Sequence, residues 1–90
     1  MTTKALMNTY GTKAATLVKG EGAWLWDANG KKYLDALSGI AVCGLGHSHP
    51  AIAAAVAEQA SVLTHCSNFF AIPNQVALAD KLCAASGMDK

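Results

Sequence analysis

The histidines and cysteines are the first residues that could do chemistry, because imidazole and thiolate groups bind metals and transfer protons. One His-x-His pair and isolated cysteines lack the close, paired spacing of structural zinc sites. We therefore expect packing and helix-terminus roles and no metal site, and we keep a zinc-binding module as an alternative. The set comprises His47, His49, His65, Cys43, Cys66 and Cys83.

Two other groups could bind a ligand. The first is glycine-rich and contains residues 20–22, Gly39, Gly44 and Gly46, but its spacing is not that of a phosphate loop or a dinucleotide fingerprint. The second places polar donors beside two aromatic rings and is a candidate edge of a pocket or of an interface. A loop held by two buried rings is the alternative. The second group is Ser67, Asn68, Phe69 and Phe70.

The elements are organised around residues 38–50, with the sequence SGIAVCGLGHSHP. The apolar residues 40–43 predict a short buried strand, the glycines that follow allow a change of direction, and Pro50 suits the first position of a helix. An apolar segment that leads through glycines to a polar rim can form one wall of a ligand pocket. A plain strand–loop–helix connection is the alternative.

Residues 16–35 predict a small antiparallel β unit. Residues 16–19 and 23–26 have strand character, and residues 27–30 (DANG) form a strong turn signal. Residues 31–35 then return as the paired strand. Because a hairpin is only marginally stable alone in water, it should lie against another layer.

Two helices are predicted in residues 49–90. Asn74 or its neighbour is the expected cap of the second helix, and Gly87 suits its C-terminal end. Together with the arm, the β unit and the pocket-wall loop of residues 1–48, these helices make an α+β segment. The apolar stripes are Ile52, Val56, Ala60 and Leu63 in the first helix, and Leu78, Leu82 and Ala85 in the second.

The composition favours contacts with something outside the ninety residues. Hydrophobic residues make up 52% of the chain and charged residues only 14%. A chain of this length buries only roughly 60–65% of its unfolded surface, so such an apolar chain would leave apolar surface uncovered. A small non-catalytic binding module is the alternative, and it would need a more polar exterior.

Charge and cysteine usage limit the function classes. The net charge of +1 gives no electrostatic case for binding nucleic acid or an anionic membrane. Residues 1–10 do not have the pattern of a secretory leader, and no apolar run reaches the length of a membrane span. Cysteines without paired spacing fit a reducing compartment, so the sequence predicts a cytoplasmic protein.

A long colinear pattern of motifs runs through the chain from about residue 10 onward. It consists of GEGAWLWD (20–27), NGKKYLD (29–35), SGIAV (38–42) and LGHSHP (45–50), followed by His65, Ser67, Asn68, Gln75, Leu78, Ala79, Leu82, Ser86 and Gly87. This order resembles the N-terminal segment of class III pyridoxal-phosphate aminotransferases, in the branch of the acetylornithine and ornithine enzymes.

The resemblance implies a fold-type I enzyme that is an obligate homodimer with active sites at the subunit interface. Pyridoxal phosphate would be bound to a lysine of a large domain, outside these ninety residues. The amino group would pass from the terminal amine of N-acetylornithine to 2-oxoglutarate. Ornithine, succinylornithine and 4-aminobutyrate are alternative donors.

The resemblance also assigns site residues. None of the ninety residues is expected to be catalytic or to bind the cofactor. The segment expected to line the substrate pocket is Ser38, Gly39, Ile40, Ala41 and Val42, and ornithine-preferring relatives carry a tyrosine at the position of Ile40. Because the segment should pack on a large domain and a partner subunit, we expect a contiguous exposed apolar patch. The patch should include Phe69 or Phe70 and part of residues 38–46. So thin a layer could not cover all of its large apolar side chains, which are Trp24, Trp26, Ile40, Val42, Phe69 and Phe70.

Overall fold

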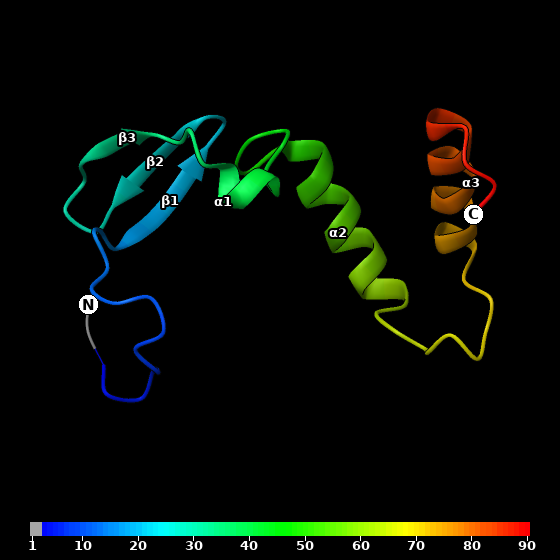
Figure 1. Cartoon of the computed structure of the whole chain (residues 1–90), viewed down its shortest axis with the longest axis horizontal. Helices are drawn as coiled ribbons and strands as arrows, with labels where there is room; N and C mark the ends of the chain where they lie inside the picture. The colour runs from blue at the N-terminus through cyan, green and yellow to red at the C-terminus, as the bar shows by residue number, and fades with distance from the viewer. Residues whose placement is uncertain (1–2) are drawn as a thin grey trace. The chain divides into compact units, whose positions relative to one another are not determined.

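The computed structural model describes residues 3–90, which form two compact units with a boundary between Ala57 and Glu58. Within these residues, three strands are followed by three helices, as labelled in Figure 1. No helix of the described chain is both long and apolar enough to span a membrane. The elements are β1 (Leu17–Glu21), β2 (Trp24–Asp27), β3 (Lys32–Leu34), α1 (Ser38–Ala41), α2 (Pro50–Val62) and α3 (Pro73–Ser86).

The three strands form one antiparallel sheet in the order β1-β2-β3, which confirms the β unit predicted at residues 16–35. One face of the sheet carries two tryptophans under lysine side chains. The Lys32 Nζ lies 4.1 Å from the ring centroid of Trp24, and the Lys19 Nζ lies 4.7 Å from that of Trp26. Within this unit, lysine side chains therefore provide part of the cover over these rings.

The turn between β2 and β3 is held by one carboxylate. Asp27 Oδ1 accepts hydrogen bonds from the N–H groups of Asn29 and Lys31, both at 2.9 Å, and Oδ2 accepts one from the Tyr33 hydroxyl at 2.9 Å. The Tyr33 hydroxyl and these backbone donors lower the pKa of Asp27, and the same contact raises the pKa of Tyr33. Gly30 completes the reversal at a φ of +83°.

The strand predicted at residues 40–43 is wrong. The chain instead makes a single turn, α1, and side-chain hydrogen bonds described below hold this turn. An apolar run can fit a strand or a turn. No neighbouring strand pairs with this run, because the described sheet ends at β3. The run is not buried within this chain either, since Ile40 and Val42 are 81% and 80% exposed.

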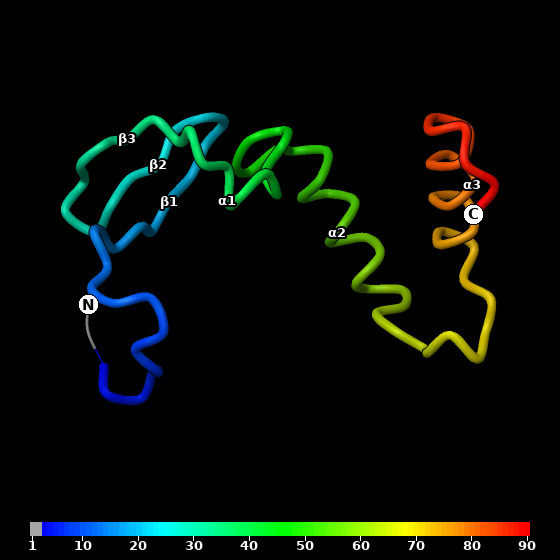
Figure 2. Tube along the Cα trace, in the orientation of Figure 1, coloured from blue at the N-terminus to red at the C-terminus, as the bar shows by residue number. Residues whose placement is uncertain are grey.

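The loop between α1 and α2 returns to the β1–β2 hairpin, as the trace in Figure 2 shows. Gly22 and His47 exchange two backbone hydrogen bonds of 3.0 and 2.8 Å. A Cβ at Gly46 would lie 2.8 Å from the carbonyl oxygen of Gly22, and one at Gly20 would lie 2.6 Å from the Cβ of His47. Three glycines from the two glycine-rich stretches therefore lie where two backbones approach closely.

Helix α2 begins at Pro50, as predicted. The Nδ1 of His49 accepts a hydrogen bond of 3.2 Å from the N–H of Ala51, so this imidazole satisfies a donor of the first turn. The helix-terminus role expected within the histidine set is confirmed for His49.

Helix α3 begins at Pro73 and ends as predicted at Gly87, whose φ is +73°. The cap expected at Asn74 or its neighbour is wrong, because the residue in the cap position is Ile72, which makes no side-chain cap hydrogen bond. The Asn74 amide instead donates to Oε1 of Gln59 at 3.1 Å, which ties the start of α3 to α2 within the second unit.

Neither unit has a hydrophobic core of its own, since none of the described residues is buried. The expected exposure of large apolar side chains is confirmed for Trp24, Ile40, Val42, Phe69 and Phe70, whereas Trp26 is half-buried. The contiguity of these side chains across the two units stays a prediction. The stability of the folded segment must therefore depend on surfaces outside it.

We expect Gly46→Ala to lower the free energy of unfolding of the complete protein by about 2–4 kcal/mol. The added Cβ would meet the backbone of Gly22, and the φ of +82° disfavours any L side chain. Gly44→Ala is the matched control, because a Cβ there has open space. Denaturant unfolding of both variants measures the difference, and equal stabilities would contradict the close approach.

Candidate functional site

The first four residues of the predicted pocket segment form a left-handed turn. Ser38, Gly39, Ile40 and Ala41 have φ values of 54°, 62°, 60° and 65°. For an L residue this conformation costs about 1–2 kcal/mol, and three of these residues are not glycine. A run of this kind persists only where its surroundings hold it, and such strained backbone is concentrated at ligand and active sites.

Asp35 holds the start of this turn. Its Oδ1 accepts hydrogen bonds from the N–H groups of Leu37 at 3.0 Å and Ser38 at 2.8 Å. Its Oδ2 lies 2.5 Å from Nε2 of His47. The Asp35 side chain is only 8% exposed and that of His47 22%. The His47 contact, and next the N–H of Ser38, lower the pKa of Asp35.

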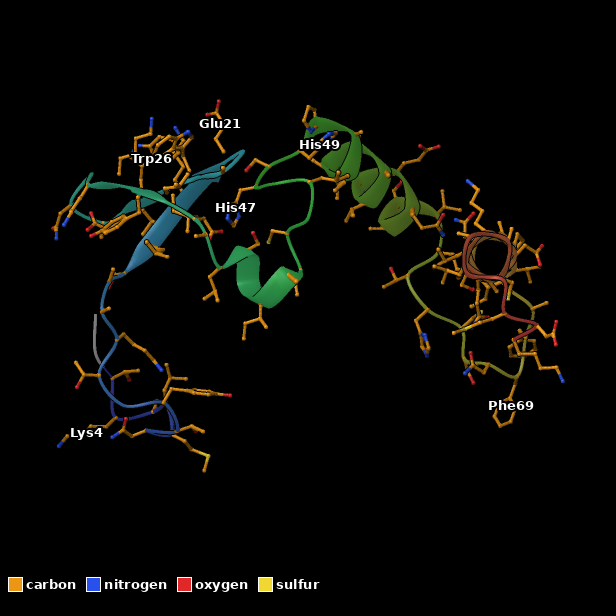
Figure 3. All side chains as sticks on the ribbon, turned by 45° about the horizontal axis from the view of Figure 1, so that its top comes forward. Lys4, Glu21, Trp26, His47, His49 and Phe69 are labelled. Atoms are coloured by element: carbon orange, nitrogen blue, oxygen red, sulfur yellow. The ribbon has the colours of Figure 1, made fainter. Side chains whose placement is uncertain are left out.

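His47 is in turn fixed to the sheet. Its backbone pairs with Gly22, its side chain lies against Gly20, and the hydroxyl of the next residue, Ser48, donates to the Gly20 carbonyl oxygen at 2.7 Å. Figure 3 shows Trp26 and His47 on opposite sides of the sheet. A continuous set of contacts thus runs from the hairpin through His47 and Asp35 to the left-handed turn.

The sequence does not predict the pairing of Asp35 with His47. By residue type, His47 groups with the cysteines, and Asp35 has no predicted role in a site. One signal was available, because an aspartate followed within three residues by a turn commonly accepts hydrogen bonds from that turn's N–H groups. The contact across the 12 residues to His47 had no local signal.

The histidines and cysteines do not form a cluster that could bind a metal ion in the described residues. Among residues 3–90 there is no group of three or more His, Cys, Asp or Glu side chains placed to hold a metal ion. Cys43, Cys66 and Cys83 are free thiols. The alternative of a zinc-binding module therefore has no support in the described part of the chain.

The second candidate edge lies in the second unit. Ser67 has a φ of +72°, and its Oγ and carbonyl oxygen accept weak hydrogen bonds from Phe69 and Phe70 at 3.4 and 3.3 Å. The rings are 92% and 66% exposed, so the alternative of a loop held by two buried rings is wrong for this chain. Figure 3 shows Phe69 directed away from the loop. Asn68 accepts from the amide of Gln75 at 3.4 Å.

The described residues do not fit the phosphate of a cofactor. Both long helices start with a proline, which lacks an N–H donor, and the ring of His49 already occupies the N–H of Ala51. The sequence contains no arginine, since all seven basic residues are lysines. We therefore derive no chemical step through a cofactor from these residues.

An antiparallel sheet, a strained apolar turn and two helices without a core define an α+β segment of a larger fold. Residues 6–90 match the family model described as aminotransferase class III. The chain belongs to the class III aminotransferase family. It is 56% identical over 85 residues to the acetylornithine aminotransferase of Nitrosomonas europaea. The aligned residues make up 94% of this chain and 22% of that relative. The chain thus spans about a fifth of the length of the curated relatives it matches.

Solved structures agree with this assignment. The acetylornithine aminotransferase of Elizabethkingia anophelis superposes with a TM-score of 0.85 at 38% identity, over 93% of this chain and 21% of that one. The ornithine aminotransferase of Plasmodium yoelii gives a TM-score of 0.89 at 32% identity, over 97% and 23%. The predicted fold, the N-terminal segment of an aminotransferase of this family, is therefore confirmed.

The charge on Asp35 should make stability depend on pH in the acid range. Its native pKa lies below the ordinary 3.8, so the ionised carboxylate stabilises the fold above that value, and this stabilisation is lost as the pH falls through the native pKa. We expect the stability difference between the wild-type enzyme and Asp35→Asn to shrink between about pH 5 and pH 3. Denaturant unfolding across this range measures it.

Asp80→Asn on the exposed face of α3 is the control for the removal of one negative charge. A stability difference for Asp35→Asn that does not change down to about pH 3 would contradict the role given to the carboxylate.

Proposed function

We propose that the complete enzyme transfers the terminal amino group of N-acetylornithine to 2-oxoglutarate, a step of arginine biosynthesis. The similarity to enzymes named acetylornithine aminotransferase, at 56% identity, is the observation that carries this proposal. We further propose a cytoplasmic homodimer, a proposal supported by the three free thiols and by a segment without a core.

The cofactor of the complete enzyme is pyridoxal phosphate, which would supply the electron sink for the bond changes at the amine carbon. Membership of the class III family supports this assignment. Residues 1–48 would form the arm, the β unit and the wall of the substrate pocket, and residues 49–90 would lead into the large domain that holds the cofactor.

The contribution of this segment is to shape the donor pocket, which residues 38–42 would line. Ile40 is held in a left-handed conformation and is 81% exposed within the chain, so its side chain is free to meet a ligand or another domain. An apolar side chain offers no hydrogen bond to a free α-amino group. It therefore suits a donor whose α-amino group carries an acyl substituent.

Residues 67–70 would form the edge of a pocket or of an interface with another protein surface. Two exposed phenylalanines side by side favour a role in contact with another protein surface over a role in solvent.

An ornithine aminotransferase is the second candidate, because a structure of that name superposes with a TM-score of 0.89. The two candidates differ in the α-amino group of the donor, which is acylated in one and charged in the other. Ile40 favours the acylated donor.

A donor panel tests the proposed function directly. We expect the complete enzyme, supplied with pyridoxal phosphate and 2-oxoglutarate, to form glutamate with N-acetylornithine at a kcat/KM at least about tenfold above that with ornithine or 4-aminobutyrate. Coupled detection of glutamate measures the rates. A preference for either of the other two donors would overturn the assignment.

Ile40→Tyr should shift this preference toward ornithine. A hydroxyl at position 40 could accept a hydrogen bond from a charged α-amino group and would crowd an acyl group. We expect the ratio of kcat/KM for N-acetylornithine to that for ornithine to fall by about tenfold. Ile40→Leu, which stays apolar, is the matched control. An unchanged ratio in Ile40→Tyr would remove this residue from the pocket.

A further inference from the structure

We propose that Asp35 and His47 are positioning residues for donor selection: they fix the left-handed turn 38–41 and so aim Ile40 at the donor. This inference rests on the proposed function, since it assigns Ile40 to the donor pocket. It adds two residues that do not themselves contact the donor.

The geometry of Asp35 supports the role of this residue in holding the turn. Both of its carboxylate oxygens are used, Oδ1 by the N–H groups of Leu37 and Ser38 and Oδ2 by His47. The two backbone donors lie at the point where the chain enters the left-handed region, since Ser38 is the first residue of the turn with a positive φ. The carboxylate therefore sets the orientation of the peptide units from which the turn continues.

The contacts that fix His47 to the sheet support the role of His47 in holding the turn. Two backbone hydrogen bonds to Gly22 and the close approach to Gly20 leave this residue little freedom relative to the sheet. Since Asp35 follows directly after β3, the pair joins the two ends of the loop that contains the turn. The loop that contains the turn is thereby held to the sheet at both of its ends.

The other described hydrogen bonds of the turn join backbone groups. The N–H groups of Ile40 and Ala41 donate to the carbonyl oxygen of Leu37 at 3.0 and 3.3 Å, and the N–H of Cys43 donates to that of Ser38 at 2.9 Å. The Ile40 side chain is largely exposed in this chain. The direction of this side chain therefore depends on the backbone of a turn that L residues adopt reluctantly. Loss of the Asp35 acceptor would let the peptide units relax and would move Ile40.

The sheet offers a matched control in Asp27. Its Oδ1 also accepts from two backbone N–H groups, and its Oδ2 also accepts one side-chain hydrogen bond, from Tyr33. It holds the turn between β2 and β3, which is not part of the proposed pocket. Asp27→Ala should therefore remove a comparable set of hydrogen bonds without moving Ile40.

The experiment compares Asp35→Ala and Asp27→Ala in the complete enzyme loaded with pyridoxal phosphate, at saturating 2-oxoglutarate. We expect Asp35→Ala to lower the ratio of kcat/KM for N-acetylornithine to that for ornithine by at least about fivefold, and Asp27→Ala to change it by less than about twofold. Asp35→Asn, which keeps the Oδ1 acceptor, should give a smaller shift than Asp35→Ala. Equal shifts in Asp35→Ala and Asp27→Ala, or none in either, would overturn the proposal.

Two further variants keep the proposal testable if Asp35→Ala does not fold. His47→Gln removes the imidazole and should shift the ratio in the same direction, and a ratio within about twofold of wild type would overturn the role of His47. In an Ile40→Ala background, Asp35→Asn should change the ratio no further, because the side chain that it positions is gone. If Asp35→Asn shifts the ratio as much in the Ile40→Ala background as it does in the wild-type background, Asp35 does not act through Ile40 and the proposal is overturned.

The failure of the proposed function would be visible separately. If the wild-type enzyme does not use N-acetylornithine, the proposed donor is wrong. The same variants are then compared on the ratio between its two best donors among ornithine, succinylornithine and 4-aminobutyrate. A shift in that ratio for Asp35→Ala but not for Asp27→Ala supports positioning, and the absence of a shift overturns it.

Discussion

The contact between Asp35 and His47 is the interaction on which the local structure depends. It joins residues 12 positions apart, and the contacts that close this loop must offset the conformational entropy that the chain between them loses. The loop contains a left-handed turn that L residues resist, so its order must come from contacts with the rest of the chain. Asp35 supplies the acceptors, and the hairpin supplies the rigid partner through His47. Without that anchor, the residues proposed to line the pocket would have no defined direction.

The second constraint is the lack of a core. No described residue is buried, although half of the chain is hydrophobic, with 52% of residues of this type. Hydrogen bonds, turn geometry and lysine–tryptophan contacts define the local structure. They are individually worth about 0.5–3 kcal/mol, and the few that are present are too little to stabilise a chain of this length against its entropy. The exposure of the large apolar side chains within this chain supports the proposed contacts with the remainder of the enzyme.

The sequence predicted those parts whose causes are local. The β unit followed from the turn residues around Asp27 and Gly30, and the start of α2 followed from Pro50. The strand predicted at 40–43 failed because an apolar run does not specify a backbone conformation, and here a side chain from outside the run decides it. The family resemblance correctly indicated the fold, but neither it nor the spacing of residues indicated that His47 and Asp35 meet. Contacts across a loop depend on where the chain returns, and this has no periodic signature.

The left-handed conformation of Ile40 has a consequence for attempts to redesign the enzyme. A β-branched side chain at a φ of 60° is poorly suited to its backbone. Glycine or asparagine would relax the turn but would remove the apolar contact that is proposed to select the donor. Stability and selectivity therefore oppose each other at one position, so that screens for thermostability would tend to erode substrate preference there. An engineer who wants both would have to strengthen the supports of the turn and leave its sequence unchanged.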